Sequence, residues 1–430
     1  MQTDRFALFG IFGGCVFFTI TGLANPFFSL YAAELGASTF AIGAMVTLKA
    51  LLPVFIAMPA GQLIDSLGPM RMLQWGSWFL LAALACMVFA DGLLLLALSQ
   101  VLLGACIVIM ASSFQVLVAK GSRDSRNEAI KRYSMWMSAG GMMGPLIGGA
   151  IASTQAIPAD GYRAAFLAST AATAVFMLVL AVVAARYPHP RQDEVEISAR
   201  DVFSLKGVTG SYRSGLDLAH LRPVQFGLIA TFLIMFIQAL YMSFLPLYLD
   251  QNGFSTMLIA ITISLKGLAG MVSRYGLTLL TRRFALEQIL MAAGLISALC
   301  VVLTPLAVTT PATMLILAAI LGGAVGVNLP VSIMVMVDAV GDGQRGKLMG
   351  LRLLSNRVSQ ILSPLMFGAL GGLFGLTAAF LSAGAMLVAT VTGFSVFARR
   401  SLIAPVVAPV AAPVAAPVVA PGTPAKEPAE

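Results

Sequence analysis

Long apolar segments separated by short polar loops are the feature that most restricts the fold of this chain. A membrane-spanning helix needs roughly 20 apolar residues, and about a dozen such segments follow one another between residues 6 and 398. Hydrophobic residues make up 59% of the sequence and charged residues only 10%. A soluble domain of this length would carry about 25% charged residues. The pattern therefore predicts an all-helical integral membrane protein.

The boundaries of these segments follow from where the apolar runs stop at polar, glycine or proline residues. We predict twelve spans at 6–32, 38–62, 71–90, 93–118, 131–154, 163–185, 223–249, 255–280, 286–308, 312–337, 348–372 and 376–398. Loops on one side carry nearly all the basic residues, while those on the other carry Arg163 alone among the bases. Because basic loops stay in the cytoplasm, both termini are expected inside a cell membrane. The net charge of +8 then reflects topology and gives no reason to expect a nucleic-acid partner.

The chain repeats itself halfway along. A shift of 217 positions aligns Gly36 with Gly253 and Ser38 with Ser255, and it also places Lys49 on Lys266 and Tyr31 on Tyr248. We therefore expect a six-helix bundle over 1–186, a central cytoplasmic loop over 187–222 and a second bundle over 223–400. Residues 401–430, rich in proline and alanine, predict a disordered cytoplasmic tail. Two pseudo-symmetric halves are the plan of alternating-access carriers.

The two lysines are the main candidates for a binding site. Lys49 follows Ser38 by 11 residues, or about 16 Å along a helix, so its side chain lies deep in the membrane. A charge there costs about 2.5–3.5 kcal/mol on insertion scales and usually marks a pathway; a local structural brace is the alternative. None of the 18 acidic residues falls in the middle of a predicted span. The lysines are thus expected to bind an anion or to carry protons.

Further polar residues in the spans extend this candidate site. Arg357 and Asn356 lie in the eleventh span, Gln238 and Tyr241 in the seventh, and Asn25 and Tyr31 in the first. Any of them could instead hydrogen-bond the backbone of a neighbouring helix. Arg352 lies closer to the cytoplasmic end, where an ion pair with Asp338 or Asp65 in a gate is the favoured interpretation.

Three motifs resemble those of the major facilitator superfamily, and within it the twelve-helix drug-exporter-like branch. The loop at 61–71, GQLIDSLGPMR, is similar to the family's gate motif and contributes Gly61, Asp65, Gly68 and Arg71. The fifth span contains an exporter-associated glycine motif, and residues 23–38 resemble the segment that opens many such exporters. The glycine motif consists of Gly140, Gly144, Pro145, Gly148 and Gly149. The family's fourth-span arginine is replaced by Gln100 and the arginine after the gate aspartate by Ser66.

The resemblance implies a monomeric secondary transporter of a small molecule, with export driven by proton antiport. The cationic core favours an anionic cargo such as a siderophore-like metabolite carrying a carboxylate, hydroxamate or phosphate. Uptake of an organic anion or sugar-like metabolite is an alternative within transport, and a non-transporting membrane sensor or scaffold is another. The sequence contains no nucleotide-binding loop, nucleophile elbow or metal-ligand spacing, so we expect neither enzymatic activity nor a cofactor or metal.

Overall fold

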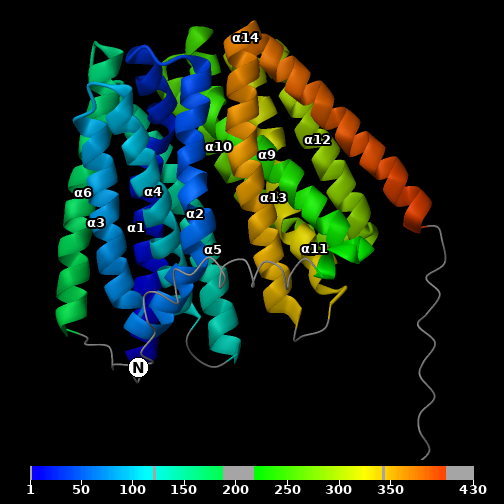
Figure 1. Cartoon of the computed structure of the whole chain (residues 1–430), viewed down its shortest axis with the longest axis horizontal. Coiled ribbons are helices and arrows are strands. Elements are labelled where there is room, and N and C mark those ends of the chain that lie inside the picture. The colour runs from blue at the N-terminus through cyan, green and yellow to red at the C-terminus, as the bar shows by residue number, and fades with distance from the viewer. Residues whose placement is uncertain (1, 120–122, 187–216, 341–343, 403–430) are drawn as a thin grey trace, which may run out of the picture.

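Helices form the whole of the described structure (Figure 1). The computed structural model describes residues 2–119, 123–186, 217–340 and 344–402. Most of the expected central loop at 187–222, and the tail from residue 403, lie outside these residues. The first six helices are α1 (Gln2–Glu34), α2 (Thr39–Leu67), α3 (Pro69–Val88), α4 (Leu93–Val118), α5 (Arg123–Ala152) and α6 (Pro158–Arg186).

The second half begins with a short 3-10 helix, Asp217–His220, and repeats the plan. Its helices are α9 (Arg222–Gln251), α10 (Thr256–Tyr275), α11 (Leu277–Arg283), α12 (Leu286–Ala307), α13 (Pro311–Val337) and α14 (Arg345–Leu402). Gly375, at φ 81°, divides α14 into two helices. The break predicted between 372 and 376 is thus where the chain turns.

Ten helices in the described ranges are long and apolar enough to cross a membrane. α5, which begins with charged and polar residues, is not among them, and the divided α14 is counted once. With these two differences the twelve predicted spans correspond to twelve long helices in two bundles. The span predicted at 255–280 ends earlier, because α10 stops at Tyr275 and the short α11 follows. α5 starts eight residues before the predicted 131.

The turns that open α2 and α10 are built alike. Gly36 and Gly253 adopt φ values of 81° and 79°, a conformation that favours glycine. Ser38 then caps α2 by accepting a hydrogen bond from the Ala41 amide at 3.2 Å, and Ser255 caps α10 at 3.4 Å. The sequence repeat therefore sets the same backbone turn and cap in both halves. We call the end of the molecule with these turns the turn end, and the opposite one the termini end.

The two bundles meet through matching helix pairs, α2 with α14 and α5 with α10. The Thr47 hydroxyl donates to the Ile361 carbonyl at 3.2 Å. Its repeat counterpart, Ser264, donates to the Met142 carbonyl at 2.8 Å. In Figure 1, α2 and the first part of α14 lie close at the turn end and separate toward the termini end. The contacts between the halves thus use matching helix pairs, and α5 and α10 stay in contact as far as Arg274 and Ser138.

Glycines of the fifth-helix motif bring α5 against α1. A methyl group at Gly144 would lie 2.6 Å from the Gly22 Cα atom, and one at Gly148 would lie 2.5 Å from the Leu23 carbonyl oxygen. Gly140 faces the Cys15 carbonyl in the same way. Small residues at such crossings let backbones approach closely in membranes, where packing rather than the hydrophobic effect holds helices together. Pro145 lies beside these glycines inside α5, buried.

Replacing Gly144 by alanine is expected to destabilise the first bundle. The added methyl group overlaps the α1 backbone, and overpacking of this kind costs about 1–3 kcal/mol. We expect Gly144→Ala to lower the thermal unfolding midpoint of the purified protein in detergent, measured by fluorescence-detected size exclusion. Gly141→Ala is the matched control, because a methyl group there has no neighbour within 4 Å. Equal midpoints for the two variants would contradict the packing described.

Candidate functional site

Lys49 lies at a small pocket between the two halves. The pocket is bounded by α1, α2 and α4 of the first half and by α9 of the second, through Asn25, Phe28, Ser29, Val46, Lys49, Gln100, Met242 and Ser243. The Lys49 amine donates to the Asn25 side-chain oxygen at 3.2 Å. Two residues predicted for the site, Lys49 and Asn25, are thereby brought together. A pocket where the halves meet is where a carrier of this architecture holds its substrate.

Two neutral polar residues in this pocket escaped the site prediction from sequence. Ser29 is 2% exposed, and its hydroxyl has no hydrogen-bond partner among the described residues. Gln100, 1% exposed, makes only a long contact of 3.5 Å from its amide nitrogen to the Ser99 hydroxyl. A buried polar group without a partner costs about 1–3 kcal/mol. Ser29 and Gln100 therefore leave hydrogen-bonding capacity facing the space beside Lys49.

Lys266 occupies the matching place in the second half, with a different neighbour. Its amine lies 5.7 Å from the centre of the Tyr241 ring, within the range of a cation–π contact. The position that corresponds to Asn25 is Met242 in the repeat, so the amide that accepts from Lys49 has no counterpart at this position in the second half. Because Tyr241 directly precedes the Met242 and Ser243 of the Lys49 pocket, both lysines approach the same turn of α9.

The backbone around each lysine is held by a glycine on a neighbouring helix. A methyl group at Gly104 of α4 would collide with the Lys49 carbonyl, and one at Gly322 of α13 with the Lys266 carbonyl. The two glycines are 55 and 56 residues after their lysines. The backbones at Lys49 and Lys266 are thus in close contact with α4 and α13, which limits how α2 and α10 can rotate.

Polar side chains of the first part of α14 form a connected group. Arg357 donates to the Gln360 side-chain oxygen at 3.1 Å, and Gln360 donates to that of Asn356 at 2.6 Å. Arg357 precedes Ile361, the partner of Thr47, by one helical turn, so it lies toward the termini end from the level of Lys49. Gln238 lies in α9 one turn before Tyr241 and Met242, and its buried side-chain oxygen has no partner among the described residues.

Arg274 is a basic residue that the sequence prediction missed. It lies near the end of α10, half-buried against α5, with one terminal nitrogen 3.5 Å from the Ser138 hydroxyl. Its Nε atom is buried without a hydrogen-bond partner in the described chain, as is that of Arg352. The predicted span at 255–280 placed Arg274 close to a loop, where arginines are ordinary. Its position between two helices became visible only with tertiary packing.

The charge of this region is one-sided. The ion pairs in the described chain are Arg132 with Glu128 and Arg163 with Asp91, and all four side chains lie more than a third exposed. No carboxylate with a described side chain pairs with Lys49 or Lys266. The same residues hold no group of three or more His, Cys, Asp or Glu side chains suited to a metal ion. Among the described side chains, the two core lysines therefore lack an acidic partner.

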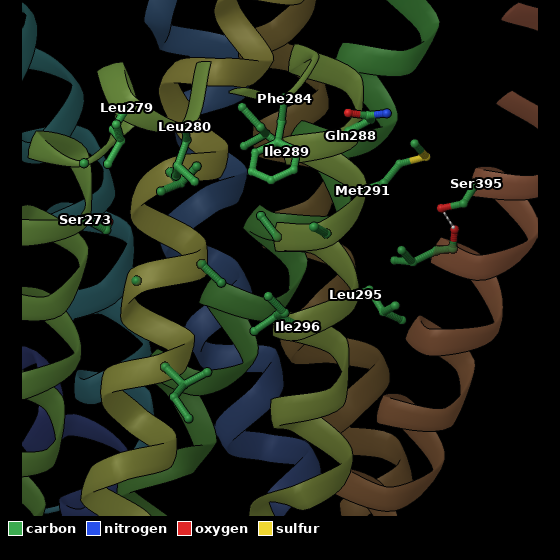
Figure 2. Close-up of a pocket in the computed structure, with 18 of the residues that line it drawn as sticks. Ser273, Leu279, Leu280, Phe284, Gln288, Ile289, Met291, Leu295, Ile296 and Ser395 are labelled. Carbon is green, nitrogen blue, oxygen red and sulfur yellow. Dashed lines mark hydrogen bonds between the residues drawn. The ribbon is translucent and has the colours of Figure 1, made fainter. Parts of the chain in front are cut away.

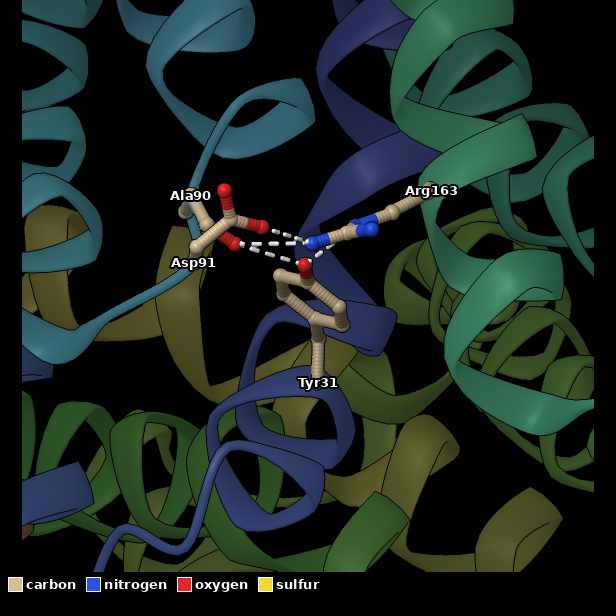
Figure 3. Close-up of polar contacts among 4 residues, drawn as sticks. All are labelled: Tyr31, Ala90, Asp91 and Arg163. Atoms are coloured by element: carbon tan, nitrogen blue, oxygen red, sulfur yellow. Dashed lines mark hydrogen bonds and ion pairs between the residues drawn. The ribbon is translucent and has the colours of Figure 1, made fainter.

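Tyr31, predicted to bind substrate, instead braces helices at the turn end. It is fully buried, and its hydroxyl donates to the Ala90 carbonyl at 2.7 Å. Figure 3 shows Arg163 reaching the Tyr31 hydroxyl, the Ala90 carbonyl and the Asp91 carboxylate together. The Tyr31 ring packs on the Phe166 ring, with 5.5 Å between the ring centres. All hydrogen-bonding groups of Tyr31 are thus used within the first bundle, away from Lys49.

Tyr241 and Tyr248 likewise contact neighbouring helices within the second bundle. The Tyr241 hydroxyl is bound to the Cys300 carbonyl at 3.0 Å and to the Thr304 hydroxyl. Only the ring of Tyr241, beside Lys266, remains for a ligand. Tyr248, the repeat partner of Tyr31, packs on Phe380 at 4.9 Å.

The residues expected at a gate are placed only in part. Gly68 has φ 85° and forms the turn between α2 and α3, as predicted. Gly61 does not belong to that turn, because α2 continues to Leu67 and no atom lies within 4 Å of a methyl group built there. Arg71 and Asp338 are exposed, and Arg352 has no ion pair with Asp338. The side chain of Asp65 lies outside the described residues.

Solved structures of transporters share this fold at low sequence identity. The chain matches a mutant of the peptide transporter POT in complex with sulfate with TM-score 0.72 and 14% identity, covering 91% of this chain and 94% of that one. A mutant of the nucleoside transporter NupG matches with TM-score 0.73 and 14% identity, covering 91% of this chain and 99% of that one. A bacterial homolog of the human lysosomal transporter Spinster, in an inward-facing and unoccupied conformation, matches with TM-score 0.72 and 16% identity. The match covers 94% of this chain and 96% of that one.

Sequence comparison gives the family without a near relative. No curated protein is similar to the chain at a significant level. The family profile described as Major Facilitator Superfamily matches residues 10–311 and 288–420, which together include nearly the whole chain. With its two helical bundles and its transporter-like fold, the protein belongs to the major facilitator superfamily.

Proposed function

We propose that this protein is a secondary transporter that moves a small organic anion across the membrane by alternating access. The observation that carries the proposal is the pair of lysines, Lys49 and Lys266, at one turn of α9 with no carboxylate partner among the described side chains. Membership of the superfamily supports transport. The uncompensated charge supports an anionic cargo over the cationic one that drug exporters with buried carboxylates take.

The pocket at Lys49 provides donors suited to a carboxylate, hydroxamate or phosphate group. The lysine supplies charge. Among the described residues the Ser29 hydroxyl has no hydrogen-bond partner, and the Gln100 amide nitrogen makes a long contact of 3.5 Å with the Ser99 hydroxyl. The Asn25 amide nitrogen adds another donor, since its oxygen already accepts from Lys49. Charge-assisted hydrogen bonds are roughly twice as strong as neutral ones. The anionic group of the cargo would thus satisfy buried atoms that now lack partners.

Binding across both lysines would couple the cargo to motion of the two halves. Lys49 follows Thr47 by two residues, and Lys266 follows Ser264 by two. The hydroxyls of Thr47 and Ser264 make two of the hydrogen bonds between the bundles. An anion held by one lysine from each half draws α2 and α10 toward each other. A ligand shifts a conformational equilibrium only through such differential contacts.

The direction of transport and its coupling to protons are inferred from sequence features. The resemblance of residues 23–38 and of the fifth-helix glycine motif to exporter motifs favours export. The one-sided distribution of basic loops favours a cell membrane with both termini in the cytoplasm. Proton antiport is proposed from the same resemblance to exporters. We propose export on these grounds, with uptake of an organic anion as the alternative that the vesicle experiment below separates.

Removing either lysine amine is expected to abolish anion binding while leaving the protein folded. We expect Lys49→Ala and Lys266→Ala each to weaken binding of the best anionic metabolite by at least tenfold. Loss of one partner of a desolvated charge pair costs about 2–5 kcal/mol. The measurement is a thermal-shift screen of purified protein against anionic, neutral and cationic metabolites, followed by titration of the hits.

The matched control for the lysine variants is Lys131→Ala. Lys131 is exposed at the termini end of α5 and belongs to no site described. Its variant should bind the anion as the unchanged protein does. If both core-lysine variants bind and transport normally, or if the only ligands are cations, the proposed cargo is wrong.

Everted membrane vesicles are expected to accumulate the anion when a proton gradient, acidic inside, is imposed. Export from the cell corresponds to inward movement in everted vesicles, and antiport uses protons that leave the lumen. The measurement is uptake of labelled anion with and without an uncoupler, with Lys49→Ala vesicles as the control. Loss of preloaded anion under the same gradient would instead indicate uptake symport in the cell.

A further inference from the structure

A wide apolar groove lies in the second bundle, apart from the lysine site (Figure 2). Its volume is about 1010 Å³, and it runs between α10, α11, α12, α13 and the second part of α14. Leu279, Leu280, Phe284, Ile289, Leu295 and Ile296 line it, together with small residues such as Ala292. Figure 1 shows the second part of α14 leaning away from α12. The groove is thus a gap between two helices on the membrane-facing side of the bundle.

The size and lining of the groove suit hydrocarbon chains. Its volume is at the upper end of the roughly 300–1,000 Å³ found for sites of drug-sized molecules. The polar side chains in its lining are Ser273, Gln288, Thr392 and Ser395. Two of these are already bonded within the protein, since Ser273 donates to the Gly270 carbonyl and Ser395 to the Val391 carbonyl. Little polar capacity is left in the walls, so a polar solute would lose hydrogen bonds on entering.

Positive charge is concentrated at one end of the groove. Arg282 and Arg283 form the last turn of α11, directly after the lining residue Leu280. Both are exposed, and neither makes an ion pair in the part of the chain that the structure describes. Gln288 lies at the same end, with its side-chain oxygen accepting from the Ala285 amide at 3.2 Å and its amide nitrogen unused. An anionic headgroup at this end would meet two guanidinium groups and an amide donor.

Arg282 and Arg283 lie at the membrane depth expected for a lipid headgroup. α11 follows the termini end of α10, and α12 starts at Leu286. The arginines therefore lie where the predicted span reaches the membrane surface, and the apolar lining extends from there toward the middle of α12. Basic pockets at this depth bind lipid phosphates, and polybasic surfaces attract anionic lipids.

We propose that this groove binds one anionic phospholipid, with its acyl chains between α12 and the second part of α14 and its phosphate at Arg282 and Arg283. The lipid fills a gap that the side chains leave open, and it neutralises two arginines that have no acidic partner. Ser273, which lines the groove, lies on the same helix as Lys266, and Gly276 follows the last residue of that helix. A lipid bound here contacts the helix that carries one of the core lysines.

The first test compares two headgroups on the same acyl chains. Purified full-length protein is titrated in detergent with phosphatidylglycerol or phosphatidylcholine, and the bound lipid is counted by native mass spectrometry. We expect one phosphatidylglycerol to remain bound at least fivefold more tightly than phosphatidylcholine. The double variant Arg282→Gln and Arg283→Gln should remove this preference, whereas Arg186→Gln, an exposed arginine in the last turn of α6, should keep it.

The second test fills the groove. Ala292 is exposed and lines it, so Ala292→Trp places an indole where the acyl chains would lie. We expect this variant to lose the tightly bound phosphatidylglycerol, while Ala171→Trp on the exposed face of α6 retains it. Thermal unfolding midpoints of both variants verify that they are folded.

Three outcomes would overturn the proposal. Equal binding of the two lipids, in unchanged protein and in the arginine variant, would mean that the arginines do not select the headgroup. An equal stabilisation by glycerol phosphate, which has no acyl chains, would indicate a phosphate site outside the groove. Unchanged lipid binding by Ala292→Trp would show that the chains lie elsewhere. None of these results depends on the transported anion, so the lipid site and the proposed function are tested separately.

Discussion

Close contact between helix backbones is the constraint on which the rest of the structure depends. In lipid, apolar side chains gain little by leaving their surroundings, so helices associate where small residues let their backbones touch. Gly144 and Gly148 hold α5 on α1, while Gly104 and Gly322 hold the backbone carbonyls of Lys49 and Lys266. These crossings bring both lysines to one turn of α9 and set the depth at which their charges lie. The positions of the two lysines thus depend on the packing of α2 against α4 and of α10 against α13.

The uncompensated positive charge gives this scaffold its chemical character. Charged groups in the membrane are retained where they serve a pathway or find partners, and the described carboxylates that pair with arginines do so near the surface, as Asp91 does with Arg163. The lysines instead have an amide in one half and an aromatic ring in the other. The surroundings of the two lysines thus differ between the two halves of the repeat. The hydroxyl of Ser29 and the amide of Gln100 add to the polar surroundings of Lys49.

Much of the fold could be predicted because the repeat and the apolar segments are local signals. The turns at Gly36 and Gly253, the caps at Ser38 and Ser255 and the break near Gly375 each depend on a few neighbouring residues. The site was harder to predict, since a polar residue in a span points either at a ligand or at another helix, and sequence spacing does not distinguish the two. The hydroxyl of Tyr31, for example, is bound to the Ala90 carbonyl, and Gly61, expected in the loop at 61–71, lies within α2. Ser29, Gln100 and Arg274 were missed because each has an ordinary place along its own helix.

The sequence by itself determined that the chain is a twelve-helix membrane protein with two related halves, and that Lys49 and Lys266 lie deep within it without acidic neighbours in the spans. These properties follow from composition and periodicity along single helices. Tertiary structure alone decided which polar groups share a pocket, which hydroxyls join the halves, and that a groove opens between α12 and α14. The physical reason is that helix rotation and crossing depend on contacts between residues far apart in the chain. The sequence of a single helix does not specify which of its faces the neighbouring helices will cover.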